Sequence, residues 1–435
     1  LCMALMLLSG CESIFGKQSG ARGALPGKRE DVFSAERALK PDAALKGAAL
    51  DVPAATEQAE WPFAGGTLTR AHGNLALSAQ PASAWAVSIG EGSGDKGAFT
   101  APPVVGGGKV FTIDANAHIT ALSADNGAVV WQKDIPDPRP EDAEIAGAGL
   151  AFAGGKLVAT TSYGNVAVLD AGSGNLLWQK QLPSPIRSAP VVDGDRIYVT
   201  TTTNNAYDIS LQDGTLGWNH QGVEETAALM GMAAPMPLGE IVIVPYSSGQ
   251  VTALRKLNGG TVWEENLASI TPTEGTLPAM SDIQGEMVLD NNRLYVASHS
   301  GRLVVLDARS GQRLLETDAG GTSMPWVAGS TVFVLTIENQ IAALSTEDGR
   351  VRWSVDLPRY TDPEDRTDPI VWTGPVLAGG TLYLANSLGE LHGYDPHTGR
   401  ETALIGVGAP VFIPPIVAAR TLYILSDDGT LTAYR

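Results

Sequence analysis

A short phrase built on glycine and tryptophan recurs along the chain about every 45 residues. In its first copy Gly127 is followed four residues later by Trp131. The other copies keep this spacing, although two of them replace the tryptophan: Gly174 with Trp178, Gly214 with Trp218, Gly259 with Trp263, Gly311 with Leu315, Gly349 with Trp353 and Gly399 with Ala403. A repeat of this length is the period of a four-stranded propeller blade.

Each repeat contains four short apolar segments separated by turn residues. In the first unit these segments are residues 102–105, 109–112, 119–122 and 128–131, and they alternate as half-buried strands do. The glycine supplies a left-handed turn between the third and fourth strands. The tryptophan then lies on the outer strand, where a large flat side chain fills the wedge between neighbouring blades.

The two ends of the repeat region complement each other. Seven units are complete, whereas an eighth begins at residue 413 and lacks its fourth strand. Near the start, residues 83–89 form a fourth strand with no preceding three. Because closure removes edge strands that an open sheet would expose, we expect this strand to complete the last blade. The sequence predicts an all-β, eight-bladed propeller over residues 61–435.

Composition agrees with this fold and excludes one class of partner. The chain has 435 residues, of which 50 are glycine and 27 proline, and only 17% are charged, as suits an all-β protein with many tight turns. A nucleic-acid-binding surface needs clustered lysine and arginine. The net charge of −18 and the absence of such clusters argue against that function.

The first residues resemble a lipoprotein signal. Residues 1–10 are an uncharged apolar run, too short to span a bilayer, and they look like the apolar part of a signal peptide. The run ends Leu8-Ser9-Gly10-Cys11, which resembles the bacterial lipobox and implies acylation of Cys11. The alternative is an ordinary signal peptide followed by a buried thiol. Glu12, rather than aspartate, by the same resemblance favours the outer membrane.

Residues 11–60 show no sustained periodicity and are rich in Gly, Ala, Pro, Lys and Glu. This composition predicts a flexible tether between the lipid and the propeller. About 50 residues of flexible coil reach roughly 35–40 Å. Residues 25–33 are an apolar and charged patch within it that could order on a partner.

No catalytic, cofactor or metal site is predicted. Residues 92–97 match GxGxxG but lack the strand–turn–helix context of a dinucleotide site, and there is no GxSxG elbow. The acidic runs 141–144 and 362–365 do not match a calcium loop. The histidines are scattered over different blades and are expected in surface or turn positions: His72, His118, His220, His299, His392 and His397.

The closing phrases 121–131 and 168–178 resemble the tryptophan-docking motif of quinoprotein dehydrogenases. Those enzymes are eight-bladed propellers that bind pyrroloquinoline quinone with Ca²⁺. The motif shapes the blade, and the adjacent cysteine pair typical of their cofactor pocket is missing here. The resemblance therefore implies the architecture, and a quinone-dependent oxidoreductase is kept as an alternative function.

Lipobox, tether and eight such blades together resemble the BamB family, lipoprotein subunits of the machinery that assembles outer-membrane β-barrels. The resemblance implies a non-enzymatic periplasmic scaffold, lipid-anchored at the outer membrane. It implies binding to the POTRA domains of BamA and help in inserting unfolded outer-membrane proteins. A propeller scaffold for another envelope partner is a further alternative.

The partner site is expected on the longest loops between blades, residues 136–147, 219–232, 268–282 and 358–370. Such connections all emerge on one face of a propeller, and long loops on a rigid scaffold usually carry binding. The family's BamA contacts fall in the second and third of these loops, and only Leu229 and Asp282 keep the family residue. The alternative is that the loops only pack on each other. The implied contact positions are Ala227, Leu229, Met230, Asp282 and Gln284.

Overall fold

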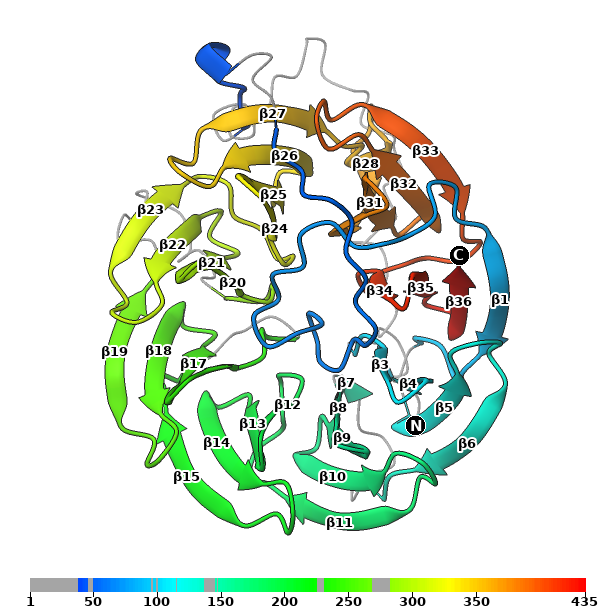
Figure 1. The fold of residues 1–435 in the computed structure, drawn as a ribbon, viewed down its shortest axis with the longest axis vertical. Helices are drawn as coiled ribbons and strands as arrows, with labels where there is room; N and C mark the ends of the chain where they lie inside the picture. Colours follow the sequence, from blue (N-terminus) through cyan, green and yellow to red (C-terminus); the bar gives the residue numbers. More distant parts are fainter. Residues whose placement is uncertain are drawn as a thin grey trace, which may run out of the picture. The chain divides into compact units, whose positions relative to one another are not determined.

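The computed structural model describes residues 38–45, 50–94, 97–98, 101–114, 116–136, 145–146, 148–224, 231–267 and 282–435. Within these residues, eight four-stranded antiparallel sheets stand as blades around a ring (Figure 1). The chain is therefore an all-β eight-bladed propeller, as the repeat predicts. None of the helices in these ranges has the length and apolarity needed to span a bilayer.

Each of the first seven blades is built from four strands that follow one another in the sequence and run from the centre of the ring outward. Blade 1 comprises β3 (Val104–Gly106), β4 (Lys109–Ile113), β5 (His118–Ser123) and β6 (Val129–Asp134); blade 2, β8 (Ala148–Ala153), β9 (Lys156–Thr161), β10 (Asn165–Asp170) and β11 (Leu176–Gln181); blade 3, β12 (Val191–Asp193), β13 (Arg196–Thr200), β14 (Asn205–Ser210) and β15 (Leu216–Gln221); blade 4, β16 (Met236–Leu238), β17 (Ile241–Pro245), β18 (Gln250–Arg255) and β19 (Thr261–Asn266). Blade 5 comprises β20 (Val288–Asp290), β21 (Arg293–Ala297), β22 (Leu303–Asp307) and β23 (Arg313–Thr317); blade 6, β24 (Trp326–Ala328), β25 (Thr331–Leu335), β26 (Gln340–Ser345) and β27 (Val351–Asp356); blade 7, β30 (Trp372–Ala378), β31 (Thr381–Asn386), β32 (Glu390–Tyr394) and β33 (Glu401–Gly406).

Among the described residues, one 3₁₀ turn and two two-stranded sheets lie outside the blades. A 3₁₀ turn, η1, spans Ala43–Leu45. β2 (Gly97–Ala98) pairs in parallel with β7 (Ile145–Ala146). β28 (Tyr360–Asp362) and β29 (Thr367–Pro369) form a two-stranded hairpin, so the predicted loop 358–370 carries regular structure of its own.

The ring closes through blade 8, whose strands come from both ends of the propeller. Its order is β1 (Ser83–Ser88), β36 (Thr430–Tyr434), β35 (Thr421–Leu425) and β34 (Ile416–Ala418). β1 lies antiparallel to β36, with Trp85 opposite Ala433. The predicted closure by the N-terminal strand is confirmed.

Neighbouring blades are joined by the tryptophan and glycine of the repeat. The seven repeat glycines all adopt left-handed φ angles between 68° and 74°. A Cβ atom on Gly174 would lie 2.7 Å from the ring of Trp131 in the preceding blade, so only glycine lets the ring lie flat on the turn. The Trp131 Nε1 atom also donates a hydrogen bond to the Ala171 carbonyl in that turn, at 3.1 Å.

The same hydrogen bond recurs from blade to blade, always to the carbonyl three residues before the glycine. The pairs are Trp178 to Leu211, Trp218 to Lys256, Trp263 to Ala308 and Trp353 to Pro396. At the closure Trp85 packs on Gly127 in the same way. The equivalent carbonyl, that of Ala124, instead accepts a hydrogen bond from Arg435 at 2.7 Å.

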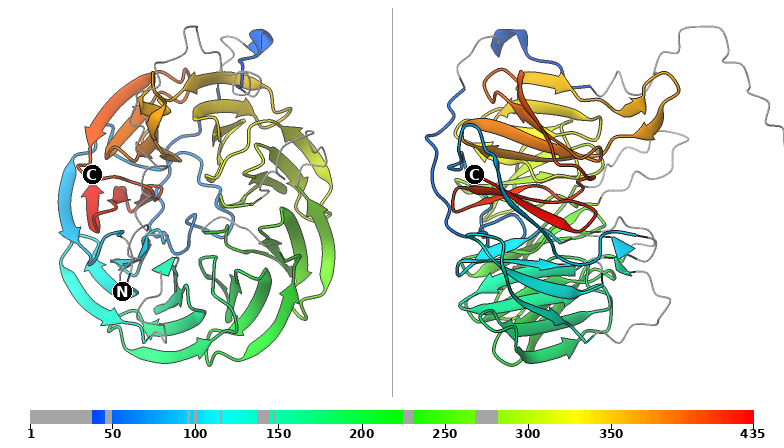
Figure 2. Two further views of the ribbon diagram at one scale, coloured as in Figure 1. Left: turned by 180° about the vertical axis from the view of Figure 1, so that it is seen from behind. Right: turned by 90° about the vertical axis from the view of Figure 1, so that its right-hand side faces the viewer.

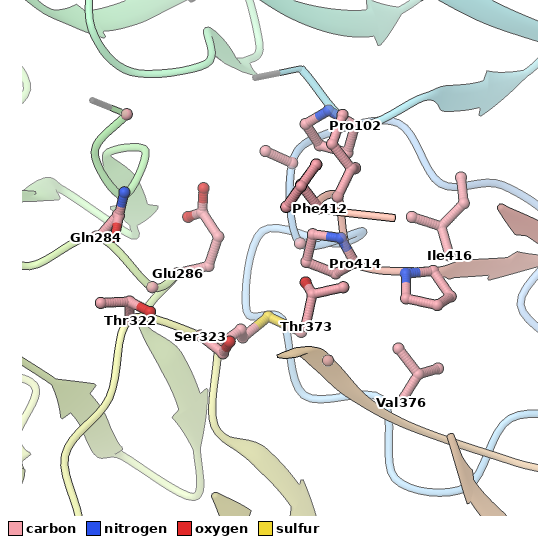
Figure 3. Close-up of a pocket in the computed structure, with 18 of the residues that line it drawn as sticks. Pro102, Gln284, Glu286, Thr322, Ser323, Thr373, Val376, Phe412, Pro414 and Ile416 are labelled. Atoms are coloured by element: carbon pink, nitrogen blue, oxygen red, sulfur yellow. The ribbon is translucent and has the colours of Figure 1, made fainter. Parts of the chain in front are cut away.

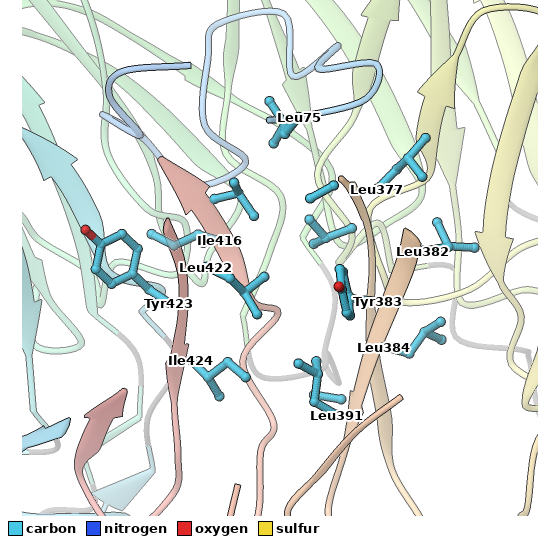
Figure 4. Close-up of a cluster of buried hydrophobic side chains, with 14 of the residues drawn as sticks. Leu75, Leu377, Leu382, Tyr383, Leu384, Leu391, Ile416, Leu422, Tyr423 and Ile424 are labelled. Atoms are coloured by element: carbon cyan, nitrogen blue, oxygen red, sulfur yellow. The ribbon is translucent and has the colours of Figure 1, made fainter. Parts of the chain in front are cut away.

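The inner three strands of each blade are buried on both faces, and this is where the core lies. Figure 4 shows one part of it, where Tyr383 of blade 7 lies on the side of its strand that faces Leu422 and Ile424 of blade 8. Leu75, from the segment preceding β1, lies in the same cluster. The fourth strands alternate between buried and exposed positions, as outer strands facing solvent do.

Residues 50–79, which we call the hub segment, cross the centre of the ring on one face (Figures 1 and 2). The segment contacts every blade through backbone or side-chain atoms. Its partners, in blade order, are Val105 for Trp61, Phe152 for Pro62, Val191 and Val192 for Phe63, Ala234 and Pro235 for Arg70, Leu289 for Thr69, Trp326 for Gly73, Leu377 for Leu75 and Ala419 for Gln58.

This arrangement corrects the expectation of a flexible tether through residue 60. The backbone NH of Leu39 donates to Gln340 in blade 6, and Thr56 pairs with Asn74 and Ala76 inside the hub segment. Residues 38–45 and 50–60 are thus part of the propeller. They show no periodicity because successive residues face different blades rather than one repeating environment. Residues 1–37, including Cys11, lie outside the described residues.

Candidate functional site

The two faces of the ring differ in what covers them. Consecutive connections of an antiparallel blade alternate between the two faces of the ring. The turns between first and second strands, and those between third and fourth strands, therefore lie on one face. The connections between blades lie on the opposite face. The hub segment lies on the first of these two faces, which we call the hub face, for example at Gly379 and Ala419. The other face, which we call the loop face, carries the interblade connections and the β28–β29 hairpin (Figure 2).

The predicted contact positions divide between residues outside and inside the described ranges. Ala227, Leu229 and Met230 fall in residues 225–230, outside the described part. Asp282 is only 2% exposed, and its Oδ2 atom lies 3.7 Å from the Nη2 atom of Arg187. The connection before blade 5 therefore carries Asp282 into the interior, whereas its position in a long loop predicts an exposed carboxylate.

Gln284 is one of the residues that line a cavity of about 380 Å³ at the centre of the ring. The hub segment contributes Trp61, Ala64 and Gly65 to this cavity. The connections leading into the blades and the first strands of blades 6, 7 and 8 contribute the remaining walls, among them Pro102, Arg187, Met232, Glu286, Ser323, Thr373 and Phe412. Its volume is in the range of small-molecule sites.

The cavity has one polar and one apolar side. In Figure 3 Gln284 and Glu286 lie together on one side, with the hydroxyls of Thr322 and Ser323 nearby. On the other side lie Phe412 and neighbouring prolines and aliphatic side chains: Pro102, Pro414, Ile416 and Val376.

A buried ion pair links the polar side to the hub segment. The Nη2 atom of Arg70 lies 3.0 Å from Oε2 of Glu286, and both side chains are largely buried. The same nitrogen donates to the carbonyls of Ala234 and Pro235. Burial raises the pKa of Glu286 from 4.5 to about 7, although Arg70 opposes this shift. Burial likewise lowers the pKa of Arg70.

His72 is a second titratable group in the hub segment. Its ring stacks on Trp61 with centroids 4.6 Å apart, and its ring nitrogens contact Gln58 Oε1 at 2.7 Å and the Gly65 carbonyl at 2.6 Å. Burial lowers the pKa of His72 to about 4, so it is neutral at pH 7. The expectation of a surface or turn histidine is therefore wrong for His72.

Among the described residues we find no group of side chains arranged as in a catalytic or metal-binding site. No three His, Cys, Asp or Glu side chains come together there as metal ligands would. The polar side chains that line the cavity include one arginine, Arg187, and one carboxyl group, Glu286, together with amide and hydroxyl groups. This arrangement can hold a ligand by charge, hydrogen bonds and apolar contact.

The fold and its repeat define an eight-bladed propeller of the PQQ-like repeat class. A family model described as "Outer membrane protein assembly factor BamB" matches residues 115–355 and 337–435. The chain belongs to the BamB family. It is 26% identical to the outer membrane protein assembly factor BamB of Yersinia pestis over 360 residues, covering 81% of this chain and 88% of that one. The Escherichia coli K12 protein of the same name is 25% identical over 396 residues, with the same coverage.

Solved structures agree on the fold. BamB from Moraxella catarrhalis superimposes with a TM-score of 0.70 at 19% identity, covering 82% of this chain and all of that one. A europium-containing methanol dehydrogenase superimposes with a TM-score of 0.66 at 16% identity, covering 85% of this chain and 89% of the other. Because both identities are low, these likenesses establish the propeller alone.

Proposed function

We propose that this protein is an assembly factor for outer-membrane proteins that acts as a non-enzymatic scaffold in the periplasm. The observation that carries the proposal is that the chain belongs to the BamB family. The interblade connections of its ring lie together on the loop face, where a partner can bind several of them. A closed ring is rigid, because its blades pack closely against one another and most of them are joined to the next by a docked tryptophan. Rigid presentation of several loops suits protein binding.

The partner in this proposal is a POTRA domain of BamA, bound through residues 219–232 with Leu229 as the apolar anchor. Unfolded outer-membrane proteins are a second class of partner. Asp282 is left out of this interface, since it is buried beside Arg187. A substitution of Asp282 by arginine would place two guanidinium groups together in the interior, so it is unsuitable as a test of the interface.

Cys11 is proposed as the lipid-carrying residue that holds the protein at the outer membrane. Acyl chains contribute about 0.8 kcal/mol per buried CH₂, so several chains give stable anchoring. The tether in this proposal is residues 12–37 only. As a flexible coil, roughly 25 residues reach roughly 25–30 Å.

The test is site-specific photocrosslinking in intact cells from position 229. Leu257 is the matched control, since it is a leucine 90% exposed in the turn between β18 and β19, on the hub face. We expect a crosslink to BamA from position 229 and none from position 257. In parallel, Leu229→Asp should reduce co-purification of BamA at least tenfold, while Leu257→Asp leaves it unchanged.

Unchanged co-purification with Leu229→Asp would reject this loop as the docking site. A crosslink to a different envelope protein would favour the alternative of a scaffold for another partner. The quinoprotein alternative is tested by adding pyrroloquinoline quinone with Ca²⁺ to the purified protein. A rise in melting temperature together with a new absorbance band would support that alternative.

A further inference from the structure

Arg187, which lines the central cavity, is a buried cation whose two terminal nitrogens lack a close hydrogen-bond acceptor among the described residues. The side chain of Arg187 is 6% exposed, and neither its Nη1 nor its Nη2 atom has a hydrogen-bond partner among the described residues. Asp282 balances its charge from 3.7 Å, which exceeds the length of an ordinary N–H···O hydrogen bond. Leaving buried N–H groups unsatisfied costs about 1–3 kcal/mol each, so this guanidinium is suited to receive an acceptor.

We propose that the central cavity is a binding site for a carboxylate carried on an apolar body, with Arg187 as the group that receives the carboxylate. A guanidinium presents parallel N–H donors that match the two oxygens of a carboxylate. This inference stands apart from the docking of BamA, because it concerns the interior of the ring rather than the loop 219–232.

The opposite wall fits the rest of such a ligand. An apolar surface lies across from the polar side, formed by Phe412, Pro414, Ile416 and Val376 (Figure 3). Small-molecule sites typically combine a mainly apolar lining with a few placed polar groups that fix orientation. A volume of about 380 Å³ accommodates an aromatic or branched aliphatic group together with one carboxylate.

The cavity is reachable from solvent. Val371 and Phe412, which line it, are 47% and 43% exposed. Exposed apolar side chains at the rim of a concave site are typical of ligand and peptide grooves. The hub segment lines one end of the cavity through Trp61 and Gly65.

Charge balance favours an anion. The polar side and the adjoining hub segment carry two arginines, Arg70 and Arg187, against the carboxyl groups of Asp282 and Glu286. Because burial raises the pKa of Glu286 to about 7, part of its population is neutral at physiological pH. Protonation of Glu286 shifts the combined charge of the four groups toward positive, which favours an incoming carboxylate.

Two kinds of ligand carry a carboxylate on an apolar body: a small free acid and the C-terminal end of a polypeptide. The test titrates the purified protein with 3-phenylpropionate and with its neutral isostere 3-phenylpropanamide. A second pair is the tripeptide Gly-Gly-Phe as free acid and as C-terminal amide. Binding is followed by tryptophan fluorescence, since Trp61, Trp326 and Trp372 line the cavity, and by calorimetry.

We expect each acid to bind at least tenfold more tightly than its amide. The double variant Arg187→Met with Asp282→Asn removes both charges together, so neither is left buried alone, and it should lose this preference. Arg420→Met is the control, because Arg420 has a side chain 65% exposed on the hub face and should keep the preference.

A tripeptide acid that binds more tightly than 3-phenylpropionate assigns the site to polypeptide ends, and the reverse order assigns it to free acids. Equal affinity for acid and amide would overturn the proposal. The proposal also fails if neither acid binds at millimolar concentration, or if the double variant, folded by its melting curve, retains the preference.

Discussion

The buried carboxyl of Glu286 should make the stability of this propeller depend on pH in a defined direction. In the folded protein, burial raises the pKa of Glu286 from 4.5 to about 7. The folded state therefore holds this proton more tightly than the unfolded chain does. Its contribution to stability is complete below pH 4.5 and is lost as pH rises through 7.

The size of the effect follows from the two pKa values. They differ by about 2.5, and each pKa unit corresponds to 1.36 kcal/mol, so the full loss is about 3 kcal/mol. Glu286→Gln removes the titration while keeping the size of the side chain and an oxygen that can accept from the backbone NH of Ala234. The variant loses the charged partner of Arg70, which shifts its stability by an amount that is largely the same at every pH.

The assay is urea unfolding of both proteins, followed by tryptophan fluorescence between pH 4.5 and 8. Subtracting one free energy of unfolding from the other cancels the titration of the shared groups. We expect the difference to move by about 3 kcal/mol in favour of Glu286→Gln as pH rises, with most of the change between pH 5 and 7. Parallel curves for the two proteins would refute a perturbed carboxyl at this position.

Three further predictions concern the hub segment and the blade contacts. His72 has its pKa lowered to about 4, so wild-type stability should fall as pH drops from 6.5 towards 4, and His72→Gln should lose less over that interval in the same urea assay. Gly174→Ala brings a Cβ within 2.7 Å of Trp131, so it should lower the free energy of unfolding by about 2–4 kcal/mol. Gly155→Ala is the control, because Gly155 has a similar φ but open space around it, and it should lower that free energy by only about 1 kcal/mol. Equal losses in the two variants would contradict the docking role of Gly174. Trp85→Ala should cost about 3 kcal/mol by loosening the closure, and an unchanged melting temperature would exclude that role.

The ring could be predicted from sequence because its determinants are local and periodic. A glycine with positive φ and an aromatic residue four positions later recur in one chain segment after another, so a single unit explains the rest. The β1–β36 pairing was also predictable, since an incomplete first unit and an incomplete last unit complete each other.

The hub segment and the cavity could not be predicted, because their determinants are neither local nor periodic. Arg70 and Glu286 are far apart in the sequence and meet only at the centre of the ring. The burial of Asp282 could not be predicted for the same reason. Its position in a loop favours exposure, yet the connection turns inward there and Asp282 pairs with Arg187. Residues that meet across the ring have no regular separation in the sequence, so no sequence pattern predicts their contact.

Two repeats lack the tryptophan, with Leu315 and Ala403 in its place. The two replacements have different causes, and one of them follows from the way the ring closes. At Gly349 the place of the aromatic ring is taken by Leu315, whose side chain would lie 3.0 Å from a Cβ atom added to the glycine. Ala403 lies on β33 and faces blade 8, whose third and fourth strands, β36 and β1, are not joined by a turn. No glycine turn is present to receive an aromatic ring there, so none is needed. The ring is instead required on β1, where Trp85 meets Gly127. The missing tryptophan at 403 and the extra one at 85 are therefore two consequences of one closure.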